Sequence, residues 1–266
     1  MGVDSTHLFG VKVWKRNKLK FIGIDLGWYS QPSGLSCLQW QDQTLSLLAF
    51  ERQHSLTEIL AWCDALISPE EPALIAVDAP TLIPNETGMR VPDKLTHKYF
   101  GRYHAGCYPA NLQRPFAERT VAFGLSLEAR NFQHAPIMIP QKLGRYQIEV
   151  YPHAAMVQLF GLEQILKYKK GRIAERKAEL KKLQHYTQTV LTQLTPRINL
   201  EDFTSAIAQP LDTLKGRALK AIEDQLDSLI CAYTGAYWWY WGNQRNQVLG
   251  DRASGYIIVP SRLEQN

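Results

Sequence analysis

The sequence predicts an α/β protein: a mixed five-stranded sheet, an antiparallel meander plus parallel strands, flanked by helices and carrying an insertion after the fourth strand. Two observations lead to this prediction. Three successive strand segments are expected between 20 and 52, and the last two of them, 33–40 and 43–52, alternate apolar and polar residues, which is typical of half-buried antiparallel strands. A helical segment then leads into the continuous apolar stretch 73–77, which is typical of a central parallel strand covered on both faces.

The elements of the first part of the chain follow in order. The meander consists of strands near 20–26, 33–40 and 43–52, and the Gln-Asp-Gln sequence before the third strand predicts a turn. Ser55 is a suitable N-cap for the helix that follows, because apolar residues then recur at helical spacing. Two prolines separate this helix from the fourth strand.

The rest of the chain is less regular. Residues 79–144 are rich in Pro, Gly, Arg, His and Tyr and predict an insertion over one end of the sheet, with one clear helix near 115–130. A fifth strand at 145–151 and a helical elaboration at about 154–210 follow. The elements expected there and beyond are helices at 154–168 and 171–194, a loop or partial helix at 197–210, a long helix at 215–241 and a short closing strand at 255–260. Residues 1–19 read as a basic, loosely ordered leader, so the expected unit is a single domain over 20–266.

Composition narrows the class of protein. The chain has 266 residues, 45% hydrophobic and 21% charged, which describes an ordinary globular protein with a substantial core. Its net charge of +5 is compatible with a polyanionic partner without requiring one. The four cysteines form no CxxC pair and favour free thiols in a reducing cytoplasm. No apolar run is long enough for a membrane span, so no membrane partner is expected.

Acidic residues end three of the predicted strands and recur on the last helix. Asp25 and Asp78 each follow an apolar run, Glu149 lies at the end of the fifth strand, and Asp224 and Asp227 are three apart on the helix. A carboxylate at the end of a buried strand is poorly solvated and needs a partner. A hard divalent cation is a partner that several converging carboxylates can share. The pattern therefore indicates metal-assisted phosphate chemistry.

Each acid also has an ordinary structural interpretation. Asp25 and Asp78 are suited to cap turns at strand ends. Asp224 is four residues after Lys220 and can form the usual ion pair of a solvated helix. Glu149 can pair with Arg145 or another basic neighbour. The joint arrangement of strand-end acids and a paired acidic helix is what favours a common site.

These motifs resemble a known family. The segments that carry the resemblance are Gly23-Ile24-Asp25, Val77-Asp78-Ala79-Pro80, Arg102-Tyr103-His104-Ala105-Gly106, Glu149-Val150-Tyr151-Pro152-His153, Tyr168-Lys169-Lys170-Gly171-Arg172 and Asp224-x-x-Asp227. Together they are similar to the domain of unknown function 429 family of predicted RNase H-like nucleases, and the last motif resembles resolvases of the RuvC type. The resemblance extends over nearly the whole chain after about Lys20 and implies an RNase H-like fold.

The resemblance also implies a function: hydrolysis of phosphodiester bonds in nucleic acid by a two-metal carboxylate site. Two Mg²⁺ or Mn²⁺ ions would be held by Asp25, as the bridging ligand, and by a subset of Asp78, Glu149, Asp224 and Asp227. The catalytic acids implied are Asp25, Asp78, Asp224 and Asp227.

Substrate contacts are expected from two basic segments. One contains Arg102, Tyr103 and His104 in the insertion, and the other contains Lys169, Lys170 and Arg172 before the basic helix. Basic side chains with nearby aromatic rings suit single-stranded or distorted nucleic acid. The other interpretation of the basic helix is a solvated face stabilised by its own charge pairs.

Two further hypotheses remain open from the sequence. Gly23-Ile24-Asp25-Leu26-Gly27 also resembles the first phosphate loop of actin-like phosphotransferases and ATPases, although those proteins duplicate their core. The other hypothesis is a non-catalytic nucleic-acid-binding module on a degenerate RNase H-like fold.

Overall fold

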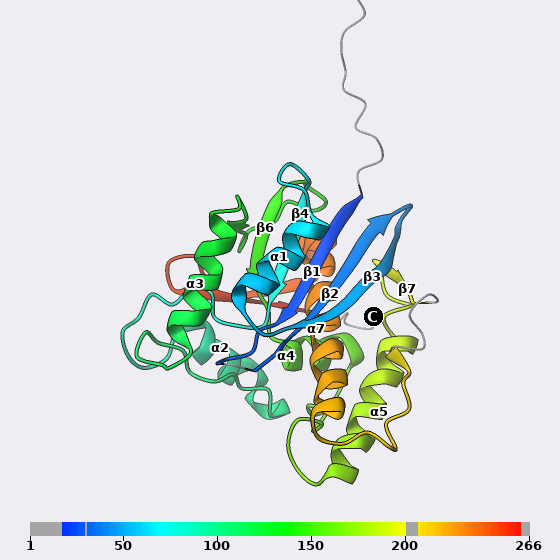
Figure 1. Ribbon diagram of the computed structural model, residues 1–266. Coiled ribbons are helices and arrows are strands. Elements are labelled where there is room, and N and C mark those ends of the chain that lie inside the picture. The colour runs from blue at the N-terminus through cyan, green and yellow to red at the C-terminus, as the bar shows by residue number, and fades with distance from the viewer. Residues whose placement is uncertain (1–17, 30, 201–206, 262–266) are drawn as a thin grey trace, which may run out of the picture.

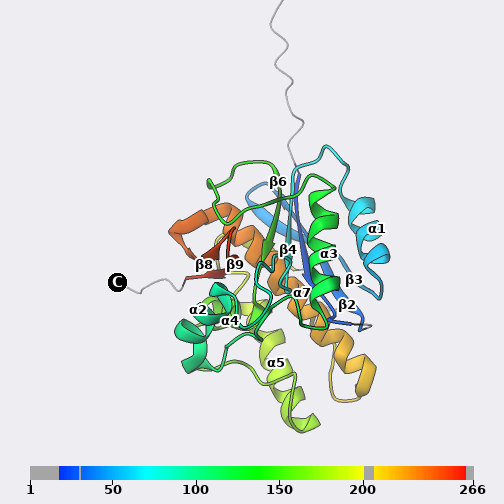
Figure 2. The same ribbon diagram turned by 90° about the vertical axis from the view of Figure 1, so that its left-hand side faces the viewer.

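The computed structural model of the protein describes residues 18–29, 31–200 and 207–261. One mixed sheet lies at its centre, with helices on both faces (Figures 1 and 2). The predicted leader, residues 1–19, lies outside the described residues except for its last two. Of these, Leu19 already belongs to the first strand.

The sheet has the strand order β5-β6-β4-β1-β2-β3-β7. Its strands are β1 (Leu19–Asp25), β2 (Ser33–Gln41), β3 (Thr44–Gln53), β4 (Ala73–Val77), β5 (Gln133–His134), β6 (Arg145–Glu149) and β7 (Arg197–Asn199). β2 runs antiparallel to both β1 and β3, whereas β4 is parallel to β1 and to β6. The five strands β3-β2-β1-β4-β6 have the order and directions of an RNase H-like fold, as the sequence predicts.

Two groups of helices cover the two faces of this sheet (Figure 2). The helices are α1 (Leu56–Leu66), α2 (Val91–Phe100), α3 (Ala117–Glu128), α4 (Pro152–Phe160), α5 (Ile173–Thr189) and α7 (Gly216–Trp241), with 3-10 turns η1 (Gly101–Tyr103) and η3 (Gly242–Gln244). α1 and α3 pack on one face over a core that includes Ile22 and Ile24. α7 crosses the other face over a core that includes Phe21 and Leu74, and it contacts β1, β2 and β4.

Two glycines let α7 lie directly on the sheet. A Cβ atom on Gly23 of β1 would come within 1.9 Å of the backbone oxygen of Ser228, and one on Gly34 of β2 within 2.0 Å of the backbone oxygen of Asp224. The Ser36 hydroxyl donates a 2.7 Å hydrogen bond to that same Ser228 oxygen. Backbone contact therefore fixes the acidic part of α7 against the ends of β1 and β2.

Several expectations from the sequence need correction. The sheet has seven strands, because the short edge strands β5 and β7 were not expected, and β7 forms where a loop or partial helix was predicted. The insertion contains a second helix, α2. Pro92 lies in its first turn, where proline is favourable. The helix predicted at 154–168 ends at Phe160, because Gly161 adopts a left-handed conformation with φ 64°. The predicted closing strand is β9 (Gly255–Pro260), which pairs with β8 (Asn246–Asp251) as a separate hairpin.

The four cysteines are free, as predicted, and three of them are buried. Within the described residues, no helix combines the length and apolar character needed to span a bilayer.

Candidate functional site

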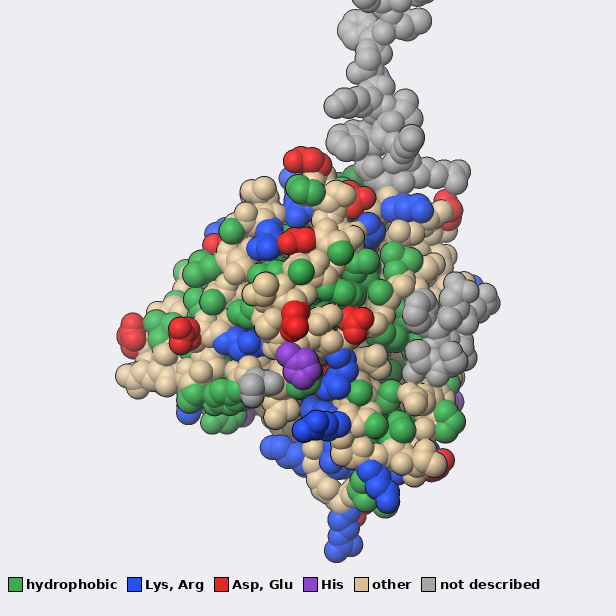
Figure 3. Space-filling model, in the orientation of Figure 1, with side chains coloured by type: hydrophobic (Ala, Val, Ile, Leu, Met, Phe, Trp, Pro, Cys, Tyr) green, Lys and Arg blue, Asp and Glu red, His purple; other side chains and the backbone are tan. Residues whose placement is uncertain are grey.

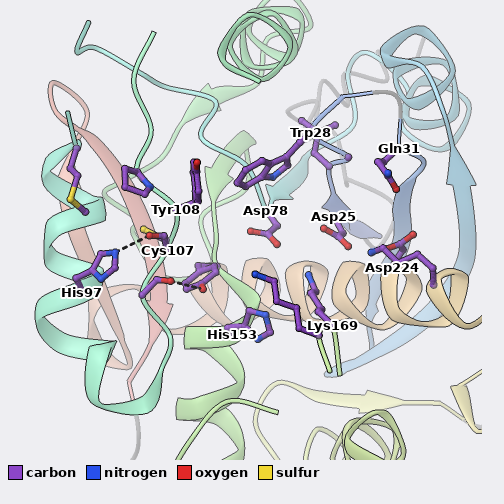
Figure 4. Close-up of a pocket in the computed structure, with 18 of the residues that line it drawn as sticks. Asp25, Trp28, Gln31, Asp78, His97, Cys107, Tyr108, His153, Lys169 and Asp224 are labelled. Atoms are coloured by element: carbon purple, nitrogen blue, oxygen red, sulfur yellow. Dashed lines mark hydrogen bonds and ion pairs between the residues drawn. The ribbon is translucent and has the colours of Figure 1, made fainter. Parts of the chain in front are cut away.

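Strand pleating directs two carboxylates toward α7. Side chains alternate between the faces of a strand, so Asp25 lies on the same face as Phe21, and Asp78, just after β4, lies on the same face as Leu74. Both of these apolar residues belong to the core under α7. The strands are adjacent and parallel, and the Asp78 amide donates a 2.8 Å hydrogen bond to the Ile24 carbonyl. The two carboxylates therefore lie side by side, as Figure 4 shows.

The first helix acid, Asp224, is held by two cations. Arg52, at the end of β3, donates a 2.8 Å hydrogen bond to its Oδ2 atom, and Lys220 pairs with its Oδ1 atom one turn earlier on α7. The Asp224 side chain is 3% exposed, so its negative charge is balanced by these two cations rather than by bulk water. The ion pair between Lys220 and Asp224, which the sequence left as an alternative, is present. Asp224 nevertheless lines the same cavity as Asp25 and Asp78.

The second helix acid, Asp227, is fully buried and is bound from the segment after α4. The Tyr168 hydroxyl donates a 2.5 Å hydrogen bond to its Oδ1 atom, and the Lys169 ammonium lies 2.7 Å from its Oδ2 atom. Arg176 of α5 fixes this segment, because it donates to the Tyr168 carbonyl at 2.9 Å and to Glu223 of α7 at 2.5 Å. Asp227 is therefore part of a network that fastens the Lys169 segment to α7.

The strand acids differ from the helix acids in their contacts. Within the described residues, neither the Asp25 nor the Asp78 carboxylate accepts a hydrogen bond or lies at ion-pair distance from a cation. Burial raises the pKa of Asp25, an effect that Lys169 partly opposes and Asp227 reinforces. Burial, followed by the charge of Asp25, raises the pKa of Asp78 well above its ordinary value. The surroundings of both carboxyl groups therefore disfavour their charged forms.

Lys169 is the central cation of this cluster. Burial lowers the pKa of its ammonium, but the charges of Asp227 and Asp25 outweigh burial and raise the pKa well above its ordinary value. In Figure 4 the Lys169 side chain points up toward Asp25 and Asp78 from below them. It is thus a fixed positive charge that faces the strand acids from the side of Asp227.

Glu149 faces the other way. It pairs with Val77 rather than with Asp78 in the register of β4 and β6, so the pleat places it on the opposite face of the sheet. There Arg90 binds it through two hydrogen bonds of 2.6 and 2.7 Å, and the same guanidinium also contacts the buried Asp93. Glu149 therefore joins β6 to the start of α2, and its partner is a basic neighbour other than Arg145.

A cavity of about 970 Å³ opens above these acids. Asp25, Asp78 and Asp224 lie in its wall together with aromatic rings, lysines from three different segments and residues of the insertion. The lining residues used below are Trp28, Lys94, Tyr108, Tyr151, His153, Lys169, Lys170 and Lys220. In Figure 3, Lys and Arg side chains gather over the lower part of the face, toward α5 and the start of α7. The site thus combines an acidic floor with a basic surround.

His153 forms a neutral part of the cavity wall. Burial, followed by the charge of Lys169, lowers its pKa to about 3, so the ring is neutral at physiological pH. It lies between the rings of Tyr151 and Tyr168, with centroids 5.8 and 5.6 Å away. Within the described residues its buried Nδ1 atom has no hydrogen-bond partner. Leaving a buried nitrogen without a hydrogen bond costs free energy. A ligand group in the cavity that forms a hydrogen bond with Nδ1 would remove this cost.

The chemistry of the donors fits a hard divalent cation. Asp25 and Asp78 offer carboxylate oxygens, the ligands that Mg²⁺ and Mn²⁺ prefer, and a cation there would offset their raised pKa values. Within the described residues, no three acidic, imidazole or thiol side chains already converge on one ion position. The remaining acids are compensated by Lys169, Lys220 and Arg52. The fit is therefore best for one ion between the two strand acids.

The predicted substrate residues fall into two groups. Lys169 and Lys170 line the cavity, whereas Arg102, Tyr103, His104 and Arg172 do not. Arg102 stacks on the Tyr103 ring, and the Tyr103 carbonyl accepts a hydrogen bond from Ile165.

Sequence reasoning missed several residues that shape the site: Trp28, Arg52, Tyr108, Tyr168 and Arg176. Arg52 was detectable in principle, because it lies opposite Gly34 in the meander and hence in the same cross-strand row as Asp25, with β2 between them. Tyr168 lies within a quoted motif. The others depend on contacts between distant segments.

One comparison with known proteins identifies a family, and the similar solved structures are distant. The profile of a family described as "Protein of unknown function (DUF429)" matches residues 23–253. A Fowlpox virus resolvase, solved as a complex with its substrate Holliday junction DNA, is 11% identical with a TM-score of 0.35, covering 82% of this chain and 95% of that chain. The RuvC structure from Thermus thermophilus is 13% identical with a TM-score of 0.35, covering 82% and 94%. No curated protein matches the chain.

Proposed function

The chain belongs to the DUF429 family, and we propose that its acidic sheet edge hydrolyses phosphodiester bonds of nucleic acid with Mg²⁺ or Mn²⁺. One observation carries the proposal. Asp25 and Asp78 end adjacent parallel strands, point to the same face and line one cavity without a compensating contact among the described residues. Leaving two such carboxylates side by side is costly unless a cation shares them.

Each charged group has a role in this proposal. Asp25 and Asp78 hold the ion, which when bound supplies Lewis-acid polarisation of the phosphate and a water of lowered pKa. Lys170, Lys220 and Lys94 line the cavity and balance phosphate charge as the backbone approaches. Asp227 and Tyr168 hold Lys169 in place, so that its ammonium stands ready for a non-bridging phosphate oxygen.

The proposal differs in the number of ions from the expectation based on the sequence, which was two. A second ion between Asp25 and the helix acids would compete with Lys169 at Asp227 and with Arg52 and Lys220 at Asp224. We therefore propose one ion on Asp25 and Asp78, with a second one binding only where Lys169 withdraws.

The described residues favour this function over an actin-like phosphotransferase. That class duplicates its core, whereas the described residues contain one meander and one central sheet of this type. The non-catalytic binding module shares the fold and differs only in whether the acids bind a cation. A direct measurement of ion binding separates these two cases.

The test is titration calorimetry with Mn²⁺, followed by cleavage of fluorescently labelled single-stranded and duplex oligonucleotides. The wild type is expected to bind Mn²⁺ and to cleave, while Asp25→Asn loses both the heat and the cleavage. Asp212→Asn is a matched control, because this exposed carboxylate pairs with Lys181 and does not line the cavity. Absence of Mn²⁺ heat from the wild type would favour the binding module.

A further inference from the structure

We propose that Trp28 and Tyr108 form a stacking site for one unpaired nucleobase at the mouth of the acidic cavity. The substrate class would then be single-stranded or locally opened nucleic acid rather than intact duplex. This inference deepens the proposed function, and its part about cleavage rests on that function.

The two rings are exposed at the place where a substrate enters. Trp28 is 37% exposed and Tyr108 is 55% exposed, and both line the cavity that contains Asp25 and Asp78. Their centroids are 5.2 Å apart in an edge-to-face arrangement. Figure 4 shows them on the opposite side of the two acids from Lys169. Single exposed aromatic rings are common on proteins, but an exposed pair that lines the same cavity as Asp25 and Asp78 is suited to binding a ligand there.

The rings are held before any ligand arrives. Phe116, which is 2% exposed, lies behind both of them, with centroids 4.6 Å from Trp28 and 6.2 Å from Tyr108. The guanidinium of Arg114 lies 5.1 Å from the centre of the Tyr108 ring. Stacking on such a platform costs little side-chain entropy, because the rings need not be immobilised by the ligand.

The turn that carries Trp28 is also tied to α3. Arg119 donates one hydrogen bond of 2.9 Å to the carbonyl of Gly27 and another of 3.1 Å to the carbonyl of His54. Trp28 follows Gly27 directly and is only three residues after Asp25. The position of the Trp28 ring relative to the acid is therefore fixed by the same backbone that ends β1.

The geometry selects an unpaired base. In a duplex, both faces of each base are covered by its neighbours, so an aromatic ring can stack only on a base that is extruded or single-stranded. Lys94 and Lys170 line the same cavity and are suited to the flanking phosphates. Stacking tolerates any base, because every base has a π face. We therefore expect preference for strand state without preference for sequence.

The experiment measures binding separately from cleavage. Fluorescence anisotropy in EDTA compares labelled single strands with blunt duplexes of the same sequence, for the full chain and its variants. The wild type is expected to prefer the single strand. Tyr108→Ala and Trp28→Ala each weaken single-strand binding by about 5- to 100-fold with little change for duplex, whereas Tyr108→Phe retains wild-type affinity. Tyr99→Ala is the control, since Tyr99 is 47% exposed on α2 and does not line the cavity.

The outcomes separate the two proposals. Equal affinity for single strand and duplex, or unchanged single-strand affinity in folded Tyr108→Ala, overturns the stacking site even where the wild type cleaves. Tyr108 is the decisive position, because its exposed ring can be removed without opening the core. Ring-dependent single-strand binding by a wild type that neither binds Mn²⁺ nor cleaves supports the stacking site and overturns the nuclease.

Discussion

The four aspartates at the sheet edge form two pairs with different surroundings. On α7, Asp224 is compensated by Arg52 and Lys220, and Asp227 by Tyr168 and Lys169. On the strands, Asp25 and Asp78 have no such contact within the described residues. A protein that buries charge normally supplies each charge with partners. The pair left without them among the described residues is the pair for which we propose a bound cation.

The two pairs also differ in the effect on stability that we expect from them. The helix acids connect β3, the Lys169 segment and α7 through direct contacts, and we expect their loss to weaken the fold, even though burial and the charge of Asp25 raise the pKa of Asp224. The strand acids destabilise it, because their mutual repulsion raises the pKa of Asp78 beyond the effect of burial. Substitutions should affect stability in opposite directions in the two pairs, and this contrast can be tested.

The largest effect is expected at the strand pair. Asp25→Asn and Asp78→Asn each remove one of the two free ligands, so the rate of Mn²⁺-dependent cleavage should fall by about 10³-fold. Single-turnover cleavage of a labelled oligonucleotide measures it, with circular dichroism to show that the fold persists. If both variants cleaved at nearly the wild-type rate, Asp25 and Asp78 would not be the ion ligands that we propose.

The next effect concerns Lys169. Lys169→Met leaves the buried Asp227 carboxylate without its cation and should lower the free energy of unfolding by about 3–5 kcal/mol. Chemical denaturation measures this change. Calorimetry should then find additional Mn²⁺ bound, because the position next to Asp227 becomes available to an ion. Unchanged stability together with unchanged ion stoichiometry would show that Lys169 is not the internal cation of the site.

A smaller effect is expected at Asp224. Because Arg52 and Lys220 are partly exposed and water can solvate them when the carboxylate is removed, Asp224→Asn should reduce cleavage by about 10-fold and stability by about 1 kcal/mol. The comparison with Asp25→Asn in the same assay is the informative measurement. If both variants lost the heat of Mn²⁺ binding equally, Asp224 would be an ion ligand as well. The distinction between strand acids and helix acids would then be wrong.

The smallest effect is a gain in stability. The pKa of Asp78 is raised on folding, so above its ordinary pKa the folded chain holds a proton that the unfolded chain has lost. Stability from this source therefore falls as pH rises through that window toward the folded-state pKa. Asp78→Asn avoids the loss and should be more stable than wild type in EDTA at neutral pH by about 1 kcal/mol.

Thermal melts across a pH series check this sign. The advantage of Asp78→Asn should shrink as the pH approaches 3.8, the ordinary pKa of the group, and adding Mn²⁺ should stabilise the wild type only. A variant that is less stable than wild type at neutral pH would show that the strand acids are compensated after all.

Much of this arrangement was accessible from sequence because it is local. Alternating and continuous apolar runs define the five central strands, and the same runs deliver Asp25 and Asp78 to neighbouring strand ends. The apolar stripe of the last helix places Asp227 at its edge, toward the sheet. Glu149, however, was included among the possible ion ligands, and the structure places it on the other face, since its neighbours Ile148 and Val150 belong to the core under α7.

The remaining features depend on contacts between segments far apart in the chain. No periodicity indicates that Lys169 reaches Asp227, or that Trp28 and Tyr108 meet across about eighty residues. The edge strands β5 and β7 have two and three residues, too few to show an alternating pattern. α2 was not predicted within the insertion, and the proline in its first turn gives no clear signal, since proline both begins and breaks helices.

The two glycines beneath α7 have a consequence for which cation the acids accept. Because the backbone of α7 contacts the strands at Gly23 and Gly34, β1, which carries Asp25, is held directly against the helix. Ca²⁺ is commonly accommodated by ligands that spread apart, whereas Mg²⁺ requires short, regular coordination. We therefore expect that Asp25, on a strand held by these contacts, adapts poorly to a large ion, and that the proposed site prefers Mg²⁺ or Mn²⁺ to Ca²⁺.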